Sequence, residues 1–204
     1  MISLEKEGGL WIARIDRPEK ANSLTAEMLQ ELAEIAEAAQ EARALILTGT
    51  GKVFSAGADL DAARAGLATS PLWERLSGAI AALPGLSIAA LNGTIAGGAI
   101  GMALACDIRI CAPTAKVFYP VMKLGFLPQP SDPRRMSQLI GRSRAAMILM
   151  AGQKIGAEEA RDWGLIDRIV APDDLMAEAK ALVTDCLSAD QTVAQGIKTL
   201  LRDA

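Results

Sequence analysis

The chain has 204 residues, of which 51% are apolar, so it is long enough for one domain with a sizeable core. Its net charge of −3 gives no electrostatic reason to expect nucleic acid or an anionic membrane as a partner. It contains no histidine, which excludes Ser-His-Asp chemistry, histidine zinc sites and a histidine general base.

Cysteine usage and the apolar segments exclude further classes. The three cysteines have no framework spacing, so buried free thiols are expected rather than a disulfide scaffold. The N-terminus lacks the basic region and apolar core of a signal peptide. The most apolar region, residues 86–112, is interrupted by glycines, Asp107 and Arg109, which makes it a poor membrane span. We therefore expect a soluble cytoplasmic protein with no metal site and no membrane partner.

The first half of the chain predicts alternating strands and helices. Residues 1–16 form two strands joined at Gly8-Gly9, because a Gly-Gly pair suits a hairpin turn. A helix follows to about residue 42, with Thr25 as its N-cap. The continuous apolar run 44–48 predicts a strand that is covered on both faces. The next expected elements are helical residues 60–83 with a break near 70–71, a strand over 87–91, a glycine-rich turn over 92–98 and a helix over 99–105.

The second half continues the same alternation. Its expected elements are strands over 107–111 and 115–119, then helices over 134–151, 157–163, 173–187 and 190–203. No internal repeat, low-complexity tract or linker divides the chain. The pattern predicts a single α/β domain with largely parallel strand pairing.

Two turns rich in small residues are candidates for chemistry. Ala56-Gly57-Ala58-Asp59 and the turn over 92–98 each follow a buried strand and lead into a helix. Backbone N–H groups at such a turn lack internal partners and favour a developing oxyanion. A packing role is the alternative for any one turn of this kind. The spacing is not G-x-G-x-x-G and no Gly-Lys-Ser/Thr is present, so a nucleotide-binding domain is disfavoured.

Four segments in order resemble the enoyl-CoA hydratase/isomerase (crotonase) superfamily. They are RPEKANSL at 17–24; LILTG at 45–49 with FSAGADL at 54–60; ALNG at 90–93 with AGG at 96–98 and ACD at 105–107; and GQKI at 152–155 with AEEA at 157–160 and GLID at 164–167. The resemblance implies a crotonase-like core of repeated ββα units over 1–190 and a truncated C-terminal helical tail over 191–204. It also implies a homotrimer or a dimer of trimers.

The resemblance implies an acyl-CoA thioester as substrate, with its carbonyl oxygen between the N–H groups of Ala58 and Gly98. Hydrogen bonds at that oxygen strengthen as an enolate forms at the α-carbon. The further substrate contacts implied are Lys20, Ala21, Ala56, Gly57, Asp59, Leu60 and Gly97. For Lys20, a solvated surface charge is an equal alternative. Coenzyme A is part of the substrate, so no separate cofactor is expected.

The sequence departs from the family at both usual acid/base positions. Gly101 stands where hydratases carry one glutamate, and Val121 stands where a second glutamate follows a proline. Hydration needs a positioned water and a proton donor, and these two residues supply neither. The resemblance therefore implies thioester binding without ordinary hydration chemistry.

Three side chains could replace the missing acids, and each has a structural alternative. Asp132 lies ahead of a predicted helix, where it or Ser131 could instead be an N-cap before Pro133. Tyr119 is the only tyrosine, and its phenol could donate a proton or simply be a buried structural group. Glu74 could reach the site only from a mobile segment.

Two hypotheses remain open. The first is an enzyme of fatty acid metabolism, a lyase or isomerase, that works through a thioester enolate with an unusual base. The second is a catalytically inactive acyl-CoA-binding or assembly protein that keeps the oxyanion hole. Under either hypothesis, the apolar face of the tail predicts burial in an oligomer; its members are Val193, Ile197, Leu200 and Leu201.

Overall fold

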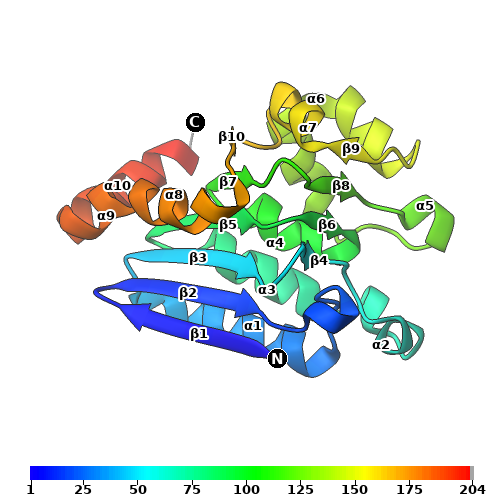
Figure 1. The fold of residues 1–204 in the computed structure, drawn as a ribbon, viewed down its shortest axis with the longest axis horizontal. Coiled ribbons are helices and arrows are strands. Elements are labelled where there is room, and N and C mark those ends of the chain that lie inside the picture. The colour runs from blue at the N-terminus through cyan, green and yellow to red at the C-terminus, as the bar shows by residue number, and fades with distance from the viewer. Residues whose placement is uncertain (203–204) are drawn as a thin grey trace.

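A computed structural model describes residues 1–202, so positions 203 and 204 of the predicted tail lie outside the described residues (Figure 1). The larger sheet has the strand order β1-β2-β3-β5-β7-β10. Its strands are β1 (Ile2–Glu7), β2 (Leu10–Ile15), β3 (Ala44–Gly49), β5 (Leu86–Leu91), β7 (Ile108–Cys111) and β10 (Arg168–Ile169). Within this sheet, as the described residues form it, only β1 and β2 pair in the antiparallel direction, so the predicted α/β fold with largely parallel pairing is confirmed.

The predicted hairpin at the N-terminus is present. Gly8 and Gly9 have φ values of +54° and +86°, and they join the two strands at the Glu7–Leu10 pair. A tight hairpin turn requires the left-handed conformation at both central positions, which glycine adopts without steric cost.

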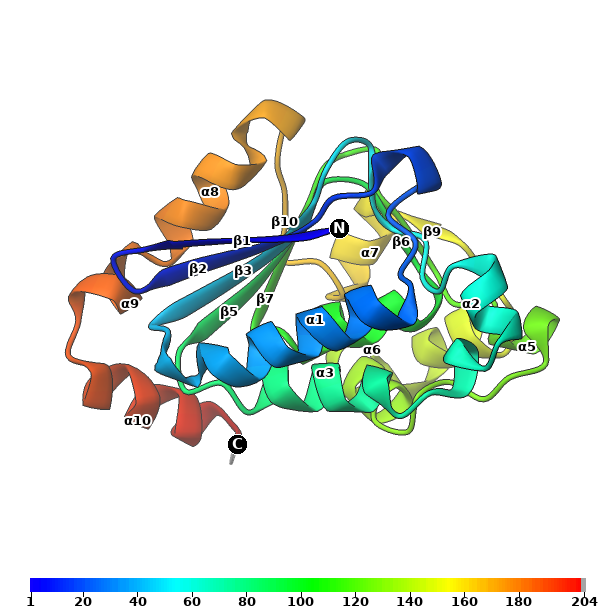
Figure 2. The same ribbon diagram turned by 90° about the horizontal axis from the view of Figure 1, so that it is seen from below.

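Helices cover both faces of the larger sheet (Figure 2). Helices α1 (Ala26–Ala38), α3 (Leu72–Ala81) and α4 (Ile100–Ala105) cover one face, and α8 (Leu175–Leu182) covers the other. Strand β3 shows why its sequence is continuously apolar. Leu45 and Leu47 pack into the core of α1 and α3, whereas Ile46 packs into the core that contains α8.

A second, smaller sheet positions the candidate site. It consists of β4 (Val53–Ser55), β6 (Thr94–Ala96), β8 (Lys116–Phe118) and β9 (Ile155–Gly156) in that order. The prediction of an uninterrupted turn over 92–98 is wrong, because β6 lies inside it. A three-residue strand is too short to show a side-chain period. Since β4 and β6 pair in parallel, the turns that follow them emerge side by side.

The remaining helices are α2 (Leu60–Arg64), α5 (Val121–Leu124), α6 (Asp132–Leu149), α7 (Ala157–Trp163), α9 (Thr184–Ser188) and α10 (Gln191–Arg202). Helix α6 is kinked at Gly141, which has φ +79° and ψ +157°, so the prediction of one regular helix over 134–151 was incomplete. The helix predicted over 173–187 is divided into α8 and α9. None of the helices among the described residues is long and apolar enough to cross a membrane.

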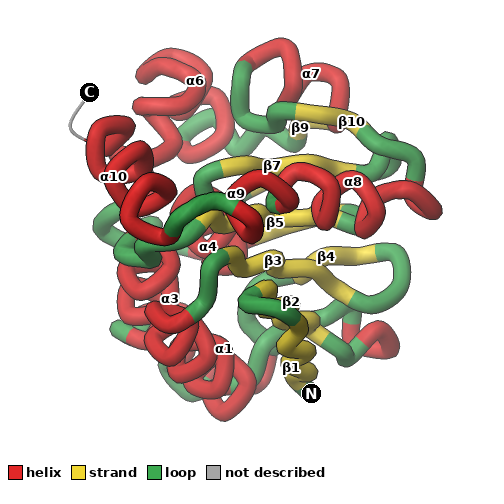
Figure 3. The backbone as a smooth tube through the Cα atoms, turned by 90° about the vertical axis from the view of Figure 1, so that its left-hand side faces the viewer, coloured by secondary structure: helices red, strands yellow, loops and turns green. Residues whose placement is uncertain are grey.

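Lys198 anchors helix α10 beside the first residues of β5 and β7. Figure 3 views the molecule from the side on which α9 and α10 lie. The Lys198 ammonium donates to the carbonyl of Gly85 at 2.6 Å and to Asp107 Oδ2 at 2.7 Å. The predicted apolar face of α10 is present, and its side chains are between 55% and 73% exposed in the single chain; they are Val193, Ile197, Leu200 and Leu201.

Candidate active site

The turn after β4 holds one backbone N–H group without an internal partner. Leu24 N donates to the carbonyl of Gly57 at 2.8 Å, and Asp59 N donates to the carbonyl of Leu24 at 2.8 Å. These two bonds flank Ala58, and Leu24 and Ala58 form an isolated parallel bridge. In that pairing the Ala58 N–H points away from Leu24, and it has no acceptor among the described residues.

Asn22 fixes this turn from behind. Its side chain accepts from Arg17 N at 2.8 Å and donates to the carbonyls of Thr50 and Val53 at 2.9 and 2.6 Å. Its own carbonyl accepts from Ser55 Oγ at 2.8 Å. Asn22 is fully buried with a φ of +54°, a conformation that asparagine tolerates better than most residues. Asn22 belongs to the segment 17–24, one of the four that carry the family resemblance, and this segment therefore has a structural role in shaping the turn.

The turn after β6 lies directly against the first one. A Cβ atom at Gly57 would be 2.8 Å from the carbonyl oxygen of Ala96, so only glycine permits this approach. A Cβ atom at Gly98 would be 3.0 Å from the indole ring of Trp73. Gly98 is the second residue of the 3-10 turn Gly97–Ala99. Its N–H is therefore one of the first N–H groups of the turn, for which the turn itself provides no carbonyl acceptor.

The helices that follow these turns contribute little electrostatic field at the turns. Helices α2 and α4 have five and six residues, which gives them only a small macrodipole. The macrodipoles of α2 and α4 therefore add little to any stabilisation of an oxyanion at the two turns. The local N–H groups of Ala58 and Gly98 are the polar features of the site.

Both turns open into one cavity of about 490 Å³. Of the residues named from the sequence, those lining it are Ala56, Ala58, Leu60, Gly97, Gly98, Tyr119 and Val121. Those not in its lining are Lys20, Ala21, Gly57, Asp59, Gly101 and Asp132. The sequence pattern did not mark several lining residues that come from distant elements, among them Trp73, Phe118, Phe126, Leu127 and Gln129. Apart from Gln129, these residues have large apolar side chains, which make the cavity wall mainly apolar.

Asp59 and Lys20 lie outside the cavity for different reasons. The Asp59 carboxylate caps α2 by accepting from two backbone N–H groups of that helix. It also pairs with Arg17 at 2.9 Å, and this hydrogen bond lowers the pKa of Asp59. Asp61, in the first turn of α2, pairs with Arg64 one turn later. Lys20 is exposed, as a solvated surface charge would be.

The two positions that lack the family's acids have different surroundings. Val121 is 6% exposed and contributes an apolar side chain to the cavity wall. Gly101 is buried in α4 beneath the carboxyl group of Asp132. A Cβ atom at Gly101 would be 2.7 Å from Asp132 Oδ1, so the aspartate occupies the room of a side chain at position 101.

Asp132 and Tyr119 form a buried contact. The Tyr119 hydroxyl donates to Asp132 Oδ2 at 3.0 Å and accepts from Gln129 N at 3.4 Å. Tyr119 is 4% exposed and Asp132 is fully buried. Burial raises the pKa of the Asp132 carboxyl to about 7, and the Glu74 carboxylate acts in the same direction. Burial and the neighbouring Asp132 raise the pKa of the Tyr119 phenol well above its usual range.

The capping interpretation of Ser131 and Asp132 is wrong in its hydrogen bonds. Helix α6 begins at Asp132 with Ser131 as N-cap, but no side chain caps it. Ser131 instead donates from N and Oγ to Glu74 Oε1, both at 2.8 Å. Glu74 is thereby held at the start of α6 and does not line the cavity. The approach of Glu74 to the site, which the sequence left open only for a mobile segment, is not seen.

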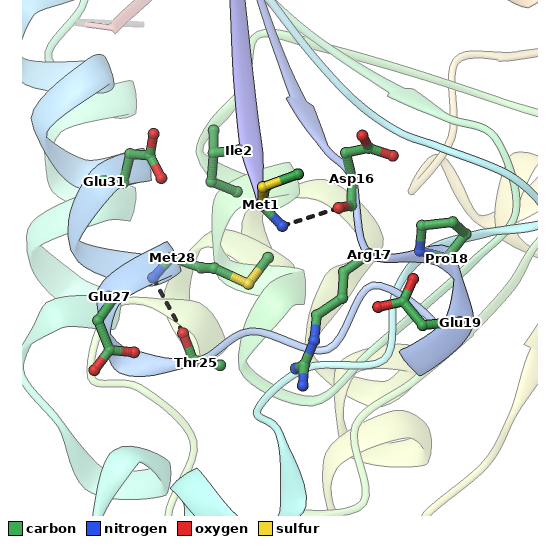
Figure 4. A pocket seen from close by; sticks show the side chains of 10 residues that line it. All are labelled: Met1, Ile2, Asp16, Arg17, Pro18, Glu19, Thr25, Glu27, Met28 and Glu31. Atoms are coloured by element: carbon green, nitrogen blue, oxygen red, sulfur yellow. Dashed lines mark hydrogen bonds between the residues drawn. The ribbon is translucent and has the colours of Figure 1, made fainter.

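A larger depression near the N-terminus, of about 700 Å³, contains none of the predicted site residues (Figure 4). The amino group of Met1 donates to the carbonyl of Asp16 at 2.9 Å, and Met28 N donates to Thr25 Oγ1 at 3.3 Å. The latter bond confirms Thr25 as the cap of α1. Within residues 1–202 no cluster of histidine, cysteine or acidic side chains could hold a metal ion.

Comparisons with known proteins agree with this architecture. The family model described as enoyl-CoA hydratase/isomerase matches residues 5–204. A short-chain-enoyl-CoA hydratase of Clostridium acetobutylicum is 34% identical over 200 residues, which cover 92% of this chain and 75% of that enzyme. The 4-chlorobenzoyl coenzyme A dehalogenase-2 of an Arthrobacter species is 30% identical, covering 96% of this chain and 75% of that enzyme.

A solved structure shows the same fold. The enoyl-CoA hydratase from Bacillus anthracis superposes with a TM-score of 0.91 at 30% identity, covering 99% of this chain and 82% of that one. The chain belongs to the enoyl-CoA hydratase/isomerase family and has the crotonase fold. The names of its relatives include both a hydratase and a dehalogenase, so membership alone does not fix the reaction.

Proposed function

We propose that this protein binds an acyl-CoA thioester with the carbonyl oxygen between the N–H groups of Ala58 and Gly98. The observation that carries the proposal is that both groups lack internal acceptors on two contacting turns that line one apolar cavity. A thioester oxygen supplies the missing acceptor, and an enolate oxygen supplies a better one. Backbone donors of this kind stabilise developing negative charge by about 3 kcal/mol each.

The reaction that fits this wall is proton transfer at the α-carbon, as in a double-bond isomerase, rather than hydration. Val121 offers no group to activate water, and Gly101 has no side chain. A second candidate function, thioester binding without catalysis, is favoured by the full burial of Asp132, which is absent from the cavity lining. The two functions share the same binding geometry and differ in turnover.

The binding proposal is tested by calorimetry with a panel of acyl-CoA esters and one thioether analogue that lacks the carbonyl oxygen. We expect esters to bind, and we expect the analogue to bind roughly tenfold or more weakly, since one or two hydrogen bonds to the oxygen are lost. Equal affinity for ester and thioether would contradict the role of the two N–H groups. Turnover of crotonyl-CoA and 3-enoyl-CoA then separates the enzyme from the inactive binder.

Further properties follow from the same proposal. Lys20 and Ala21 lie outside the acyl cavity, and we assign them to the coenzyme A portion of the ligand, together with Asp59 and Gly57. The exposed apolar face of α10 is proposed to be buried against another copy in a homotrimer or dimer of trimers. Light scattering of the purified protein measures that state directly. A cytoplasmic location, and the absence of any cofactor besides the coenzyme A of the substrate, stay predictions.

A further inference from the structure

The contact between Tyr119 and Asp132 crosses the wall of the acyl cavity. Tyr119 lines the cavity, and so does Gln129, whose backbone N–H donates to the Tyr119 hydroxyl. Asp132 lies behind them and is fully buried, with its Oδ2 3.0 Å from the hydroxyl. The hydroxyl thus connects a residue of the cavity wall to a carboxyl group that solvent does not reach.

The second oxygen of Asp132 has no hydrogen-bond partner among the described residues. It lies where a side chain at Gly101 would begin, 2.7 Å from an ideal Cβ. The carboxyl group therefore fills this space from the first residue of α6, a helix that packs against α4. An incompletely satisfied buried carboxylate binds a proton more readily than a solvated one.

The charged groups that face Asp132 do not neutralise it. Glu74, from α3, is bound to Ser131 through both the backbone N–H and the hydroxyl. Arg135, one turn along α6, donates to Ser131 Oγ at 2.7 Å. No ion pair joins Asp132 to an arginine or lysine in the described part of the chain. Among the described residues, the carboxyl group of Asp132 receives its one hydrogen bond from Tyr119, so a proton that enters or leaves this carboxyl has a direct path through that phenol.

We propose that Tyr119 takes the α-proton of the bound thioester while its own hydroxyl proton passes to Asp132. This inference rests on the proposed function. The Cα–H bond breaks, and its electron pair forms the enolate, whose oxygen receives the negative charge between Ala58 and Gly98. The proton joins Tyr119 Oη as the phenolic proton moves to Asp132 Oδ2. Asp132 becomes neutral, and the reverse transfer returns a proton to carbon. Tyr119 is the catalytic residue, and Asp132 is a positioning residue that stores the proton.

Exchange of the α-hydrogens of butyryl-CoA in D₂O, followed by mass spectrometry, tests the relay. We expect the wild-type exchange rate to rise with pH as Asp132 ionises, and then to reach a plateau. Tyr119→Phe is expected to lower exchange by roughly 100-fold or more with its Kd for butyryl-CoA little changed. Asp132→Asn should lower it similarly and remove the pH dependence. Glu31→Gln, an exposed residue of α1, is the control and should match the wild type.

The outcomes separate the two proposals. Failure of the wild type to bind butyryl-CoA overturns the proposed function. Binding without exchange, a wild-type rate that is flat with pH, or wild-type exchange in Tyr119→Phe each overturns the relay and leaves thioester binding in place. The pH profile uses the unmodified protein, so it decides the matter even where a variant folds poorly.

Discussion

Replacement of Asp132 by asparagine should remove the pH dependence of stability that this residue imposes. The carboxyl is fully buried and receives one hydrogen bond, so the folded protein holds its proton more tightly than the unfolded chain does. Burial raises its pKa from 3.8 to about 7. A carboxyl with a raised pKa contributes most to stability below its unfolded value, and that contribution is lost as pH rises through the folded value.

The magnitude follows from the same two values. Each pH unit between them is worth about 1.4 kcal/mol, so ionisation of this one buried group lowers the free energy of unfolding by roughly 4 kcal/mol between pH 4 and pH 8. Asp132→Asn has nearly the same shape but does not ionise. The wild type should therefore lose stability relative to this variant as pH rises.

Urea unfolding of the two proteins at pH 4.5, 6 and 8 measures the difference. Taking the difference between them cancels the other carboxyls, including Asp59, whose lowered pKa acts in the opposite direction. Glu31→Gln, which removes an exposed carboxylate, should follow the wild type at every pH. A difference in the free energy of unfolding between wild type and Asp132→Asn that stays constant across this pH range would refute the conclusion that ionisation of Asp132 destabilises the folded protein.

Three further substitutions test the scaffold. Gly98→Ala places a methyl group 3.0 Å from the Trp73 ring and is expected to cost about 1–3 kcal/mol of stability and to weaken acyl-CoA binding in calorimetry; unchanged affinity would contradict the placement of the thioester. Asn22→Ala removes the side-chain partner of Arg17 N–H and of the Thr50 carbonyl, while the Val53 carbonyl keeps its bond from Asn92; it should destabilise the protein by about 3 kcal/mol in urea unfolding, whereas a loss below 1 kcal/mol would count against its anchoring role. Lys198→Met removes the hydrogen bonds to the Gly85 carbonyl and to the Asp107 carboxylate, so the amides of α10 should exchange faster with D₂O; unaltered exchange would show that other contacts hold the helix.

The parts of the fold that the sequence predicted are those with strong local signals. The glycine pair between β1 and β2, the Thr25 cap and the continuous apolar run of β3 each act within a few residues. The strands that escaped prediction, β4, β6, β9 and β10, have three, three, two and two residues. Such strands are defined by their partners rather than by their own pattern. The kink at Gly141 gave no signal because glycine also occurs in straight helices.

The candidate site divides in the same way. Ala58 and Gly98 could be named in advance because the motifs around them resemble those of the enoyl-CoA hydratase/isomerase family. Trp73 and Gln129 could not, since they reach the cavity from α3 and from the segment before α6. Asp132 was expected as a possible helix cap, but its carboxyl finds a tertiary partner in the Tyr119 hydroxyl, which local spacing cannot reveal.

The most direct test of the central claim is the ¹³C NMR signal of butyryl-CoA labelled at the thioester carbonyl and bound at saturation to the wild type. Hydrogen bonds from Ala58 and Gly98 would polarise the carbonyl, so we predict a downfield shift relative to the free ester. The shift should shrink in Gly98→Ala, where the second turn is displaced by Trp73. A bound ester whose carbonyl signal coincides with that of the free ester would contradict the account.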